Sequence, residues 1–146
     1  MSNLLIGIDP DCEKSGVAIK HLFEKVLDLK SLNFFDLIDF LEKKKDEIKE
    51  VRVEASWLIS FNYTSKFANN KAIATKISNK VGENHYVGKL IVEKCKLLGI
   101  PVKEVRPLRK VWKGTNGKIS KVEFVALTNW KGPANQEERD AYLLIH

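Results

Sequence analysis

Two apolar runs of this sequence each end on a carboxylate. Asp9 closes the run LLIGID, and Glu54 closes the β-branched run VRVE. A lone acid at a strand end is most often a cap or a solvated terminus, and Glu54 alone fits that structural role as well as a functional one. Two such acids in one short chain raise the question of what balances their charge.

Another acidic position lies near the C-terminus, in the stretch NQEERDAYLLIH. Glu137 and Asp140 are three residues apart, so they share one face of a predicted helix. Glu137 also suits a first-turn acid that interacts with the helix dipole, whereas Asp140 lies deeper, beside the apolar stretch Ala141–Ile145. The sequence leaves Glu137 and Glu138 both open as the helix acid, and the spacing to Asp140 favours Glu137.

Carboxylates that converge from two strands and a helix would form a cage of hard oxygen ligands. Such a cage suits Mg²⁺ or Mn²⁺. Two ions in one site can activate a water and stabilise the leaving oxygen of a phosphodiester. The sequence therefore predicts a two-ion site and hydrolysis of a phosphodiester bond. The candidate metal ligands and catalytic acids are Asp9, Glu54, Glu137 and Asp140.

A basic segment between residues 103 and 121 supplies the opposite charge, with only Glu104 opposing it. A cluster this dense is typical of contacts with nucleic-acid phosphates, although a solvated surface loop can have the same composition. The formal net charge of +6 also favours a polyanionic partner. The candidate DNA contacts in this segment are Arg106, Arg109, Lys110, Lys113, Lys118 and Lys121.

Aromatic side chains follow Glu54 in a polar segment that contains Trp57, Phe61 and Tyr63. Exposed aromatics beside a metal site would suit the unpaired bases of a branch point. One or two of them would otherwise cover the edge of the sheet. We expect Trp57 to be the residue that stacks on a base.

The elements that must position these groups follow from hydrophobic periodicity and turn residues. Three strands should form an antiparallel meander, after which helices and strands alternate. This pattern predicts an α/β domain with a mixed five-stranded sheet and helices on its faces. Capping boxes at Ser120 and Asn135 predict the starts of two short final helices. The expected strands are 4–9, 16–20, 26–29, 51–54 and 102–105, and the longer helices are 34–47 and about 73–98.

Length and composition exclude several classes of protein. A chain of 146 residues fits one domain, residues 1–146. Cys12 and Cys95 form no CxxC pair, so a disulfide scaffold or zinc ribbon is not expected. The sequence lacks a secretory signal and an apolar membrane span, so we expect a cytoplasmic protein with no membrane partner. It also lacks the glycine-rich motifs of nucleotide cofactor sites.

Four stretches of the chain together resemble a known family. In chain order they are GIDPDCEKSGVAI, VRVEASW, RKVWKGTNGKISKVEF and PANQEERDAYLLI, and they are similar to the motifs of the RuvC Holliday junction resolvases. The resemblance spans nearly the whole chain. It implies a ribonuclease H-like fold and a metal-dependent crossover junction endodeoxyribonuclease. Such an enzyme would act as a homodimer on four-way or other branched DNA and leave a 5′-phosphate.

The resemblance also implies roles for individual acids. Asp9 matches the first-strand aspartate that bridges the two metals, and Glu54 matches the glutamate of the fourth strand. Asp140 matches the metal-binding aspartate of the final helix. Glu137 matches the additional helix acid, which is aspartate in many relatives.

Two further positions match the family outside the acids. Lys121 matches a lysine that is thought to support the scissile phosphate, and Trp57 matches an aromatic that stacks on bases near the junction centre. Asp11 departs from the small glycine of the family's turn, and the basic loop differs by about one residue from the family pattern. These departures bear on sequence specificity more than on chemistry. The compact, Lys- and Asn-rich chain suggests a phage or mobile-element member.

Two other functions remain open on the sequence. One is an RNA-processing nuclease of the related YqgF type, against which the aromatic after Glu54 and the basic loop before Lys121 argue. The other is a non-catalytic protein that binds junctions. Intact acids argue against it, because a protein without catalysis gains nothing from mutually repelling carboxylates.

Overall fold

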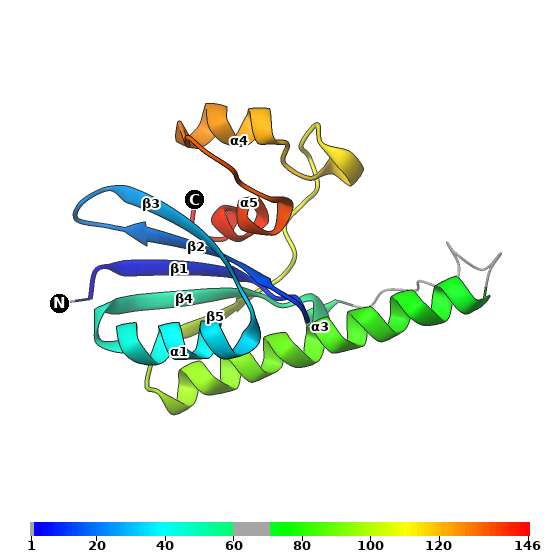
Figure 1. The fold of residues 1–146 in the computed structure, drawn as a ribbon, viewed down its shortest axis with the longest axis horizontal. Coiled ribbons are helices and arrows are strands. Elements are labelled where there is room, and N and C mark those ends of the chain that lie inside the picture. The colour runs from blue at the N-terminus through cyan, green and yellow to red at the C-terminus, as the bar shows by residue number, and fades with distance from the viewer. Residues whose placement is uncertain (1, 60–70) are drawn as a thin grey trace.

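The computed structural model describes residues 2–59 and 71–146. Its centre is a five-stranded sheet with the strand order β3-β2-β1-β4-β5 (Figure 1). The elements are β1 (Leu4–Asp9), β2 (Ser15–His21), β3 (Val26–Leu32), α1 (Phe34–Lys44), β4 (Ile48–Glu54), α3 (Lys71–Leu97), β5 (Val102–Val105), α4 (Lys121–Thr128) and α5 (Gln136–Leu143).

The sheet is mixed, as the sequence predicts. β1, β2 and β3 pair antiparallel as consecutive strands, and β1, β4 and β5 pair parallel. The observed strands are longer than predicted at β2, β3 and β4. Backbone pairing continues past the apolar run that marks each strand in the sequence, into polar residues such as Ser15 of β2, Ser31 of β3 and Glu50 of β4.

Helices cover both faces of the sheet (Figure 1). α1 and α3 lie on one face, where Leu37, Leu41, Ile91 and Cys95 are fully buried. α5 packs on β1 and β2 on the other face, and α4 packs on α5. This arrangement confirms the predicted α/β class with helices on both faces.

Strand alternation decides which side chains face α5. Because successive side chains point to opposite faces, the burial of Ile6 and Ile8 beneath α1 and α3 turns Asp9 toward the α5 face. The same rule on β4 buries Val53 beneath the first pair of helices and turns Glu54 to the α5 face. The two strand-end acids therefore lie on one side of the sheet.

The helix α5 approaches the sheet so closely that two strand positions have no room for a side chain. A Cβ added at Gly7 would lie 2.2 Å from the carbonyl oxygen of Ala141. One added at Gly16 would lie 2.2 Å from the backbone carbonyl of Glu137. Glycine at these positions lets the helix backbone rest directly on β1 and β2.

Both predicted capping boxes are present. Ser120 and Glu123 close the N-terminus of α4, and Asn135 and Glu138 close that of α5. Glu138 also accepts a hydrogen bond from Ser31 Oγ at 3.0 Å. These caps mark where the short final helices begin, and both carboxylate oxygen atoms of Glu138 accept hydrogen bonds, one from Asn135 and one from Ser31.

The two predicted long helices differ from the observed ones in detail. The helix predicted over 34–47 ends at Lys44 and continues as a 3₁₀ turn over residues 45–47. The apolar face predicted along α3 is buried only in its C-terminal half, since Ile73 is 51% exposed and Ile91 is fully buried. The N-terminal half of α3 extends past the ends of the strands (Figure 1). No helix in the described residues is long and apolar enough to cross a membrane.

Two glycines of α3 offer a matched test of this packing. We expect Gly88→Ala to destabilise the fold by about 1–3 kcal/mol, because its Cβ would lie 2.4 Å from Cζ3 of Trp57. Gly82→Ala should stabilise it by about 0.5–1 kcal/mol, since no described atom lies within 4 Å of that Cβ and alanine favours the helix. Urea unfolding of both variants checks the pair, and equal effects would contradict the packing of Trp57 on α3.

Candidate active site

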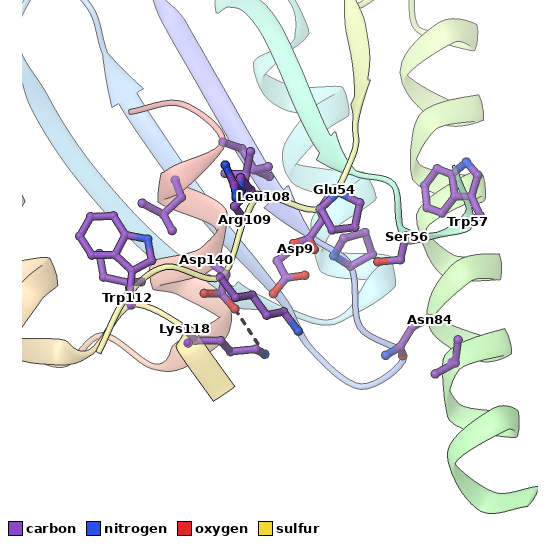
Figure 2. Close-up of a pocket in the computed structure, with 18 of the residues that line it drawn as sticks. Asp9, Glu54, Ser56, Trp57, Asn84, Leu108, Arg109, Trp112, Lys118 and Asp140 are labelled. Carbon is purple, nitrogen blue, oxygen red and sulfur yellow. Dashed lines mark ion pairs between the residues drawn. The ribbon is translucent and has the colours of Figure 1, made fainter. Parts of the chain in front are cut away.

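Three carboxylates from separate elements meet in one pocket of about 310 Å³. Asp9 ends β1, Glu54 ends the neighbouring parallel strand β4, and Asp140 lies in α5. Figure 2 shows the three side chains turned toward one another in this pocket. The structure thus brings together three of the four acids that the sequence analysis selects.

Burial and mutual repulsion alter the acidity of two of these groups. Burial raises the pKa of Asp9 well above its ordinary value, and the charges of Glu54 and Asp140 raise it further. Burial also raises the pKa of Glu54, with Asp140 as the next cause. Lys118 opposes both shifts. Burial and the neighbouring acids therefore disfavour the ionised forms of Asp9 and Glu54, and Lys118 offsets only part of this effect.

Two neighbours orient Asp140. Gln136, one turn earlier in α5, donates a hydrogen bond from Nε2 to Oδ1 of Asp140 at 2.9 Å. Lys118 Nζ lies 3.6 Å from Oδ2 of the same carboxylate. Gln136 is in turn held by the carbonyl oxygen of Ile119. Asp140 is therefore fixed by a side chain of its own helix and by the loop that precedes α4.

Two observations bear on whether the pocket could hold a divalent cation. As the side chains stand, no three His, Cys, Asp or Glu groups of residues 2–59 and 71–146 form a ready-made metal cluster. The donors are nevertheless three carboxylates in one pocket, and an ammonium group already lies against one of them. Oxygen donors with excess negative charge are the chemistry that Mg²⁺ and Mn²⁺ require. The residues present therefore fit such an ion.

Glu137 does not join the three acids. Its side chain is exposed and is not among the residues that line the pocket. Gln136 contacts Asp140 instead, because positions four apart in a helix also lie on one face. The proposed role of Glu137 as a metal ligand stays a prediction.

The basic residues divide into two groups. Arg109, Lys110 and Lys118 line the pocket. The ammonium group of Lys121 donates to the carbonyl oxygen of Gly132, and Lys121 does not line the pocket. Of Lys118 and Lys121, it is therefore Lys118 that the structure places in contact with an acid of the pocket. Arg106 and Lys113 are exposed and lie outside the pocket lining.

Trp57 forms part of the wall opposite the basic loop. It packs on Gly88 of α3, and its ring meets His85 edge to face with 6.2 Å between the ring centroids. The indole is half-buried and still lines the pocket. In this one position, Trp57 can therefore both pack against α3 and offer a surface on which a base could stack. Phe61 and Tyr63 lie outside the described residues.

Several pocket residues escape sequence reasoning. Asn84 and His85 lie in the middle of α3 and carry no pattern that connects them with the acids. Asn84 Oδ1 accepts a hydrogen bond from the backbone N–H of Cys12 at 2.8 Å, which ties α3 to the turn after Asp9. The sequence could have indicated Gln136, since its spacing of four residues from Asp140 favours contact as much as the spacing of three from Glu137 does.

Known proteins resemble this chain in structure only. No family model matches it, and no curated protein matches it. The structure of T. thermophilus RuvC in complex with Holliday junction substrate matches over 97% of this chain and 88% of that chain, with 14% identity and a TM-score of 0.52. YeaZ from Pseudomonas aeruginosa matches over 76% of this chain and 46% of that chain, with 14% identity and a TM-score of 0.39, too low to support an argument. The chain therefore has the ribonuclease H-like α/β fold of RuvC.

The burial of Asp9 and its repulsion by Glu54 and Asp140 predict a pH-dependent gain in stability from removing its charge. In EDTA at pH 7, Asp9→Asn should stabilise the protein by on the order of 1 kcal/mol, the scale of a raised carboxyl pKa. The folded pKa of Asp9 lies above its ordinary value of about 3.8, so the wild type loses stability as pH rises between these two values. The variant lacks this loss, and its advantage should shrink as pH falls toward 3.8.

Urea unfolding of the wild type and Asp9→Asn at several pH values measures this difference. Glu93→Gln is the control, because it removes an exposed carboxylate from α3 and should leave the pH dependence unchanged. A loss of stability in Asp9→Asn at pH 7 would instead assign Asp9 a structural role.

Proposed function

We propose that this protein is a metal-dependent endonuclease that cleaves phosphodiester bonds in four-way or other branched DNA. The observation that carries the proposal is the meeting of Asp9, Glu54 and Asp140 in one pocket with a basic rim. The shared fold with T. thermophilus RuvC supports a nuclease of this general kind. That neighbour was solved with a Holliday junction substrate, which favours branched DNA as the substrate here.

Asp9, Glu54 and Asp140 would hold Mg²⁺ or Mn²⁺, with Glu137 as a further ligand only if its side chain leaves its exposed position. When bound, two such ions supply an activated water and neutralise charge on the leaving oxygen. The burial of Asp9 and Glu54 serves this chemistry, because electrostatic interactions are stronger where water is excluded.

The cationic side of the pocket would bind the substrate backbone. Arg109, Lys110 and Lys118 line it, so a phosphate that enters meets positive charge opposite the acids. Arg106, Lys113 and Lys121 lie farther out and would contact phosphates beyond the scissile one. Binding through such contacts weakens steeply with salt. Trp57 on the α3 wall offers a half-buried aromatic surface to an unpaired base.

A homodimer completes the proposal. Each chain has one set of acids, whereas resolving a four-way junction requires two symmetric cuts. A two-fold dimer would place one site at each of two equivalent strands.

Cleavage of a labelled synthetic four-way junction tests this function directly. We expect paired symmetric nicks with Mg²⁺ or Mn²⁺ and none with EDTA. Asp9→Asn and Glu54→Gln should each reduce the cleavage rate by roughly 10³-fold or more while junction binding persists, because they remove metal ligands rather than phosphate contacts. Glu93→Gln, on the exposed surface of α3, should cleave like the wild type.

Three results would overturn the proposal. One is cleavage of linear duplex as readily as of the junction, since linear duplex should remain uncut. Cleavage of structured RNA with the junction intact would indicate an RNA-processing nuclease instead. Tight binding of the junction with no cleavage under any metal condition would indicate a non-catalytic junction-binding protein.

A further inference from the structure

The acid cluster contains a cation of its own. Lys118 Nζ lies 3.6 Å from Oδ2 of Asp140, as the dashed line in Figure 2 marks. The side chain of Asp140 is 16% exposed and that of Lys118 is 40% exposed, so the pair is partly shielded from water. Among the ion pairs of residues 2–59 and 71–146, this one alone involves an acid of the pocket.

The charge of Lys118 reaches beyond its partner. It favours the ionised forms of Asp9 and Glu54 as well as contacting Asp140, so a single ammonium group acts on all three carboxylates. A cation at this place reduces the repulsion that burial intensifies. The oxygen atom that it contacts, Oδ2 of Asp140, belongs to one of the candidate metal ligands.

Hydrogen bonds fix the backbone around Lys118 and leave its side chain flexible. The N–H of Lys118 donates to Thr115 at 3.1 Å, and its carbonyl oxygen accepts from Gly114 at 2.9 Å. The next residue, Ile119, is fully buried, and its carbonyl oxygen accepts from side chains of α5. The loop is therefore fastened to the helix that carries Asp140. The four-carbon stem of the lysine can still move its ammonium group.

We propose that Lys118 occupies the cation position of the acid cluster in the metal-free protein, and that a divalent ion binds there by displacing its ammonium group toward the incoming phosphate. This inference rests on the proposed function, because it presumes that the acids bind metal. It gives Lys118 a positioning role: it holds the carboxylates together before the metal arrives and is released to the substrate side afterwards.

Competition of this kind has a thermodynamic signature. A ligand that must displace an internal group binds more weakly by the free energy of that displacement. Removal of the ammonium group should therefore strengthen metal binding, whereas removal of Lys121, which donates to Gly132 outside the pocket lining, should have no such effect. The same removal should destabilise the metal-free protein, since Asp140 loses its ion-pair partner and Asp9 and Glu54 lose a nearby positive charge, although Lys110 still acts on Glu54.

Lys118→Met and Lys121→Met form a matched pair for the test. Both remove a lysine near the start of α4 and keep most of the apolar stem, and only Lys118 contacts the acids. In calorimetric titrations without DNA, we expect Lys118→Met to bind Mn²⁺ about tenfold more tightly than the wild type. Its melting temperature in EDTA should be lower than that of the wild type, and its gain on adding Mn²⁺ should be larger. Lys121→Met should match the wild type in Mn²⁺ affinity.

Lys118→Arg provides the conservative comparison, because it keeps a cation on a long stem. It should retain Mn²⁺ affinity close to that of the wild type. If Lys118→Met does not fold, Lys118→Gln takes its place as the variant without the charge, and Lys118→Arg remains the comparison. Equal Mn²⁺ affinity in the wild type and in the variant without the charge would overturn this inference and leave the proposed nuclease intact. No Mn²⁺ binding by the wild type would overturn the proposed function itself.

Discussion

The close approach of α5 to β1 and β2 is the constraint on which the rest of the structure depends. Gly7 and Gly16 leave room for the helix backbone, and any side chain there would collide with it. Because the helix rests on the sheet at these points, Asp140 comes to lie over the ends of β1 and β4. Arg52 of β4 adds a second tie by donating to the carbonyl oxygen of Leu144, just past the end of α5. Helix and strands therefore hold their acids in one fixed relation.

This arrangement brings three carboxylates together in a partly buried pocket, which by itself lowers the stability of the fold. Local preferences elsewhere in the chain agree with the structure: the strands alternate, the final helices have complete caps and the helical faces are buried where they meet the sheet. Conflicts between local stability and arrangement are expected chiefly where function requires them. The acid cluster is such a conflict, and the loop that carries Lys118 moderates it. The same loop presents Arg109 and Lys110 to the pocket, so the elements that balance the acids are also those that would bind a phosphate.

The likeness to T. thermophilus RuvC extends over nearly the whole chain at 14% identity. At such an identity few side chains are shared, and what the two chains have in common is the fold. Within this chain, the long helix α3 shows that hydrophobic periodicity is a local signal. Its C-terminal half follows the sheet and is buried, whereas its N-terminal half leaves the sheet although the periodicity of the sequence continues. Periodicity predicts a face, and only a neighbouring element buries it.

The sequence by itself determined the α/β class, the meander, the two capped final helices and the acids at the ends of β1 and β4. These features depend on local chemistry: on alternation, on turn residues and on side chains that cap the next turn of backbone. The tertiary structure alone decided the partners. It turned Gln136 rather than Glu137 toward Asp140, placed Lys118 rather than Lys121 beside the acids, and brought Asn84 and His85 of α3 to the pocket wall. Each of these contacts depends on how one element packs on another. The spacing of residues along the chain does not specify that packing.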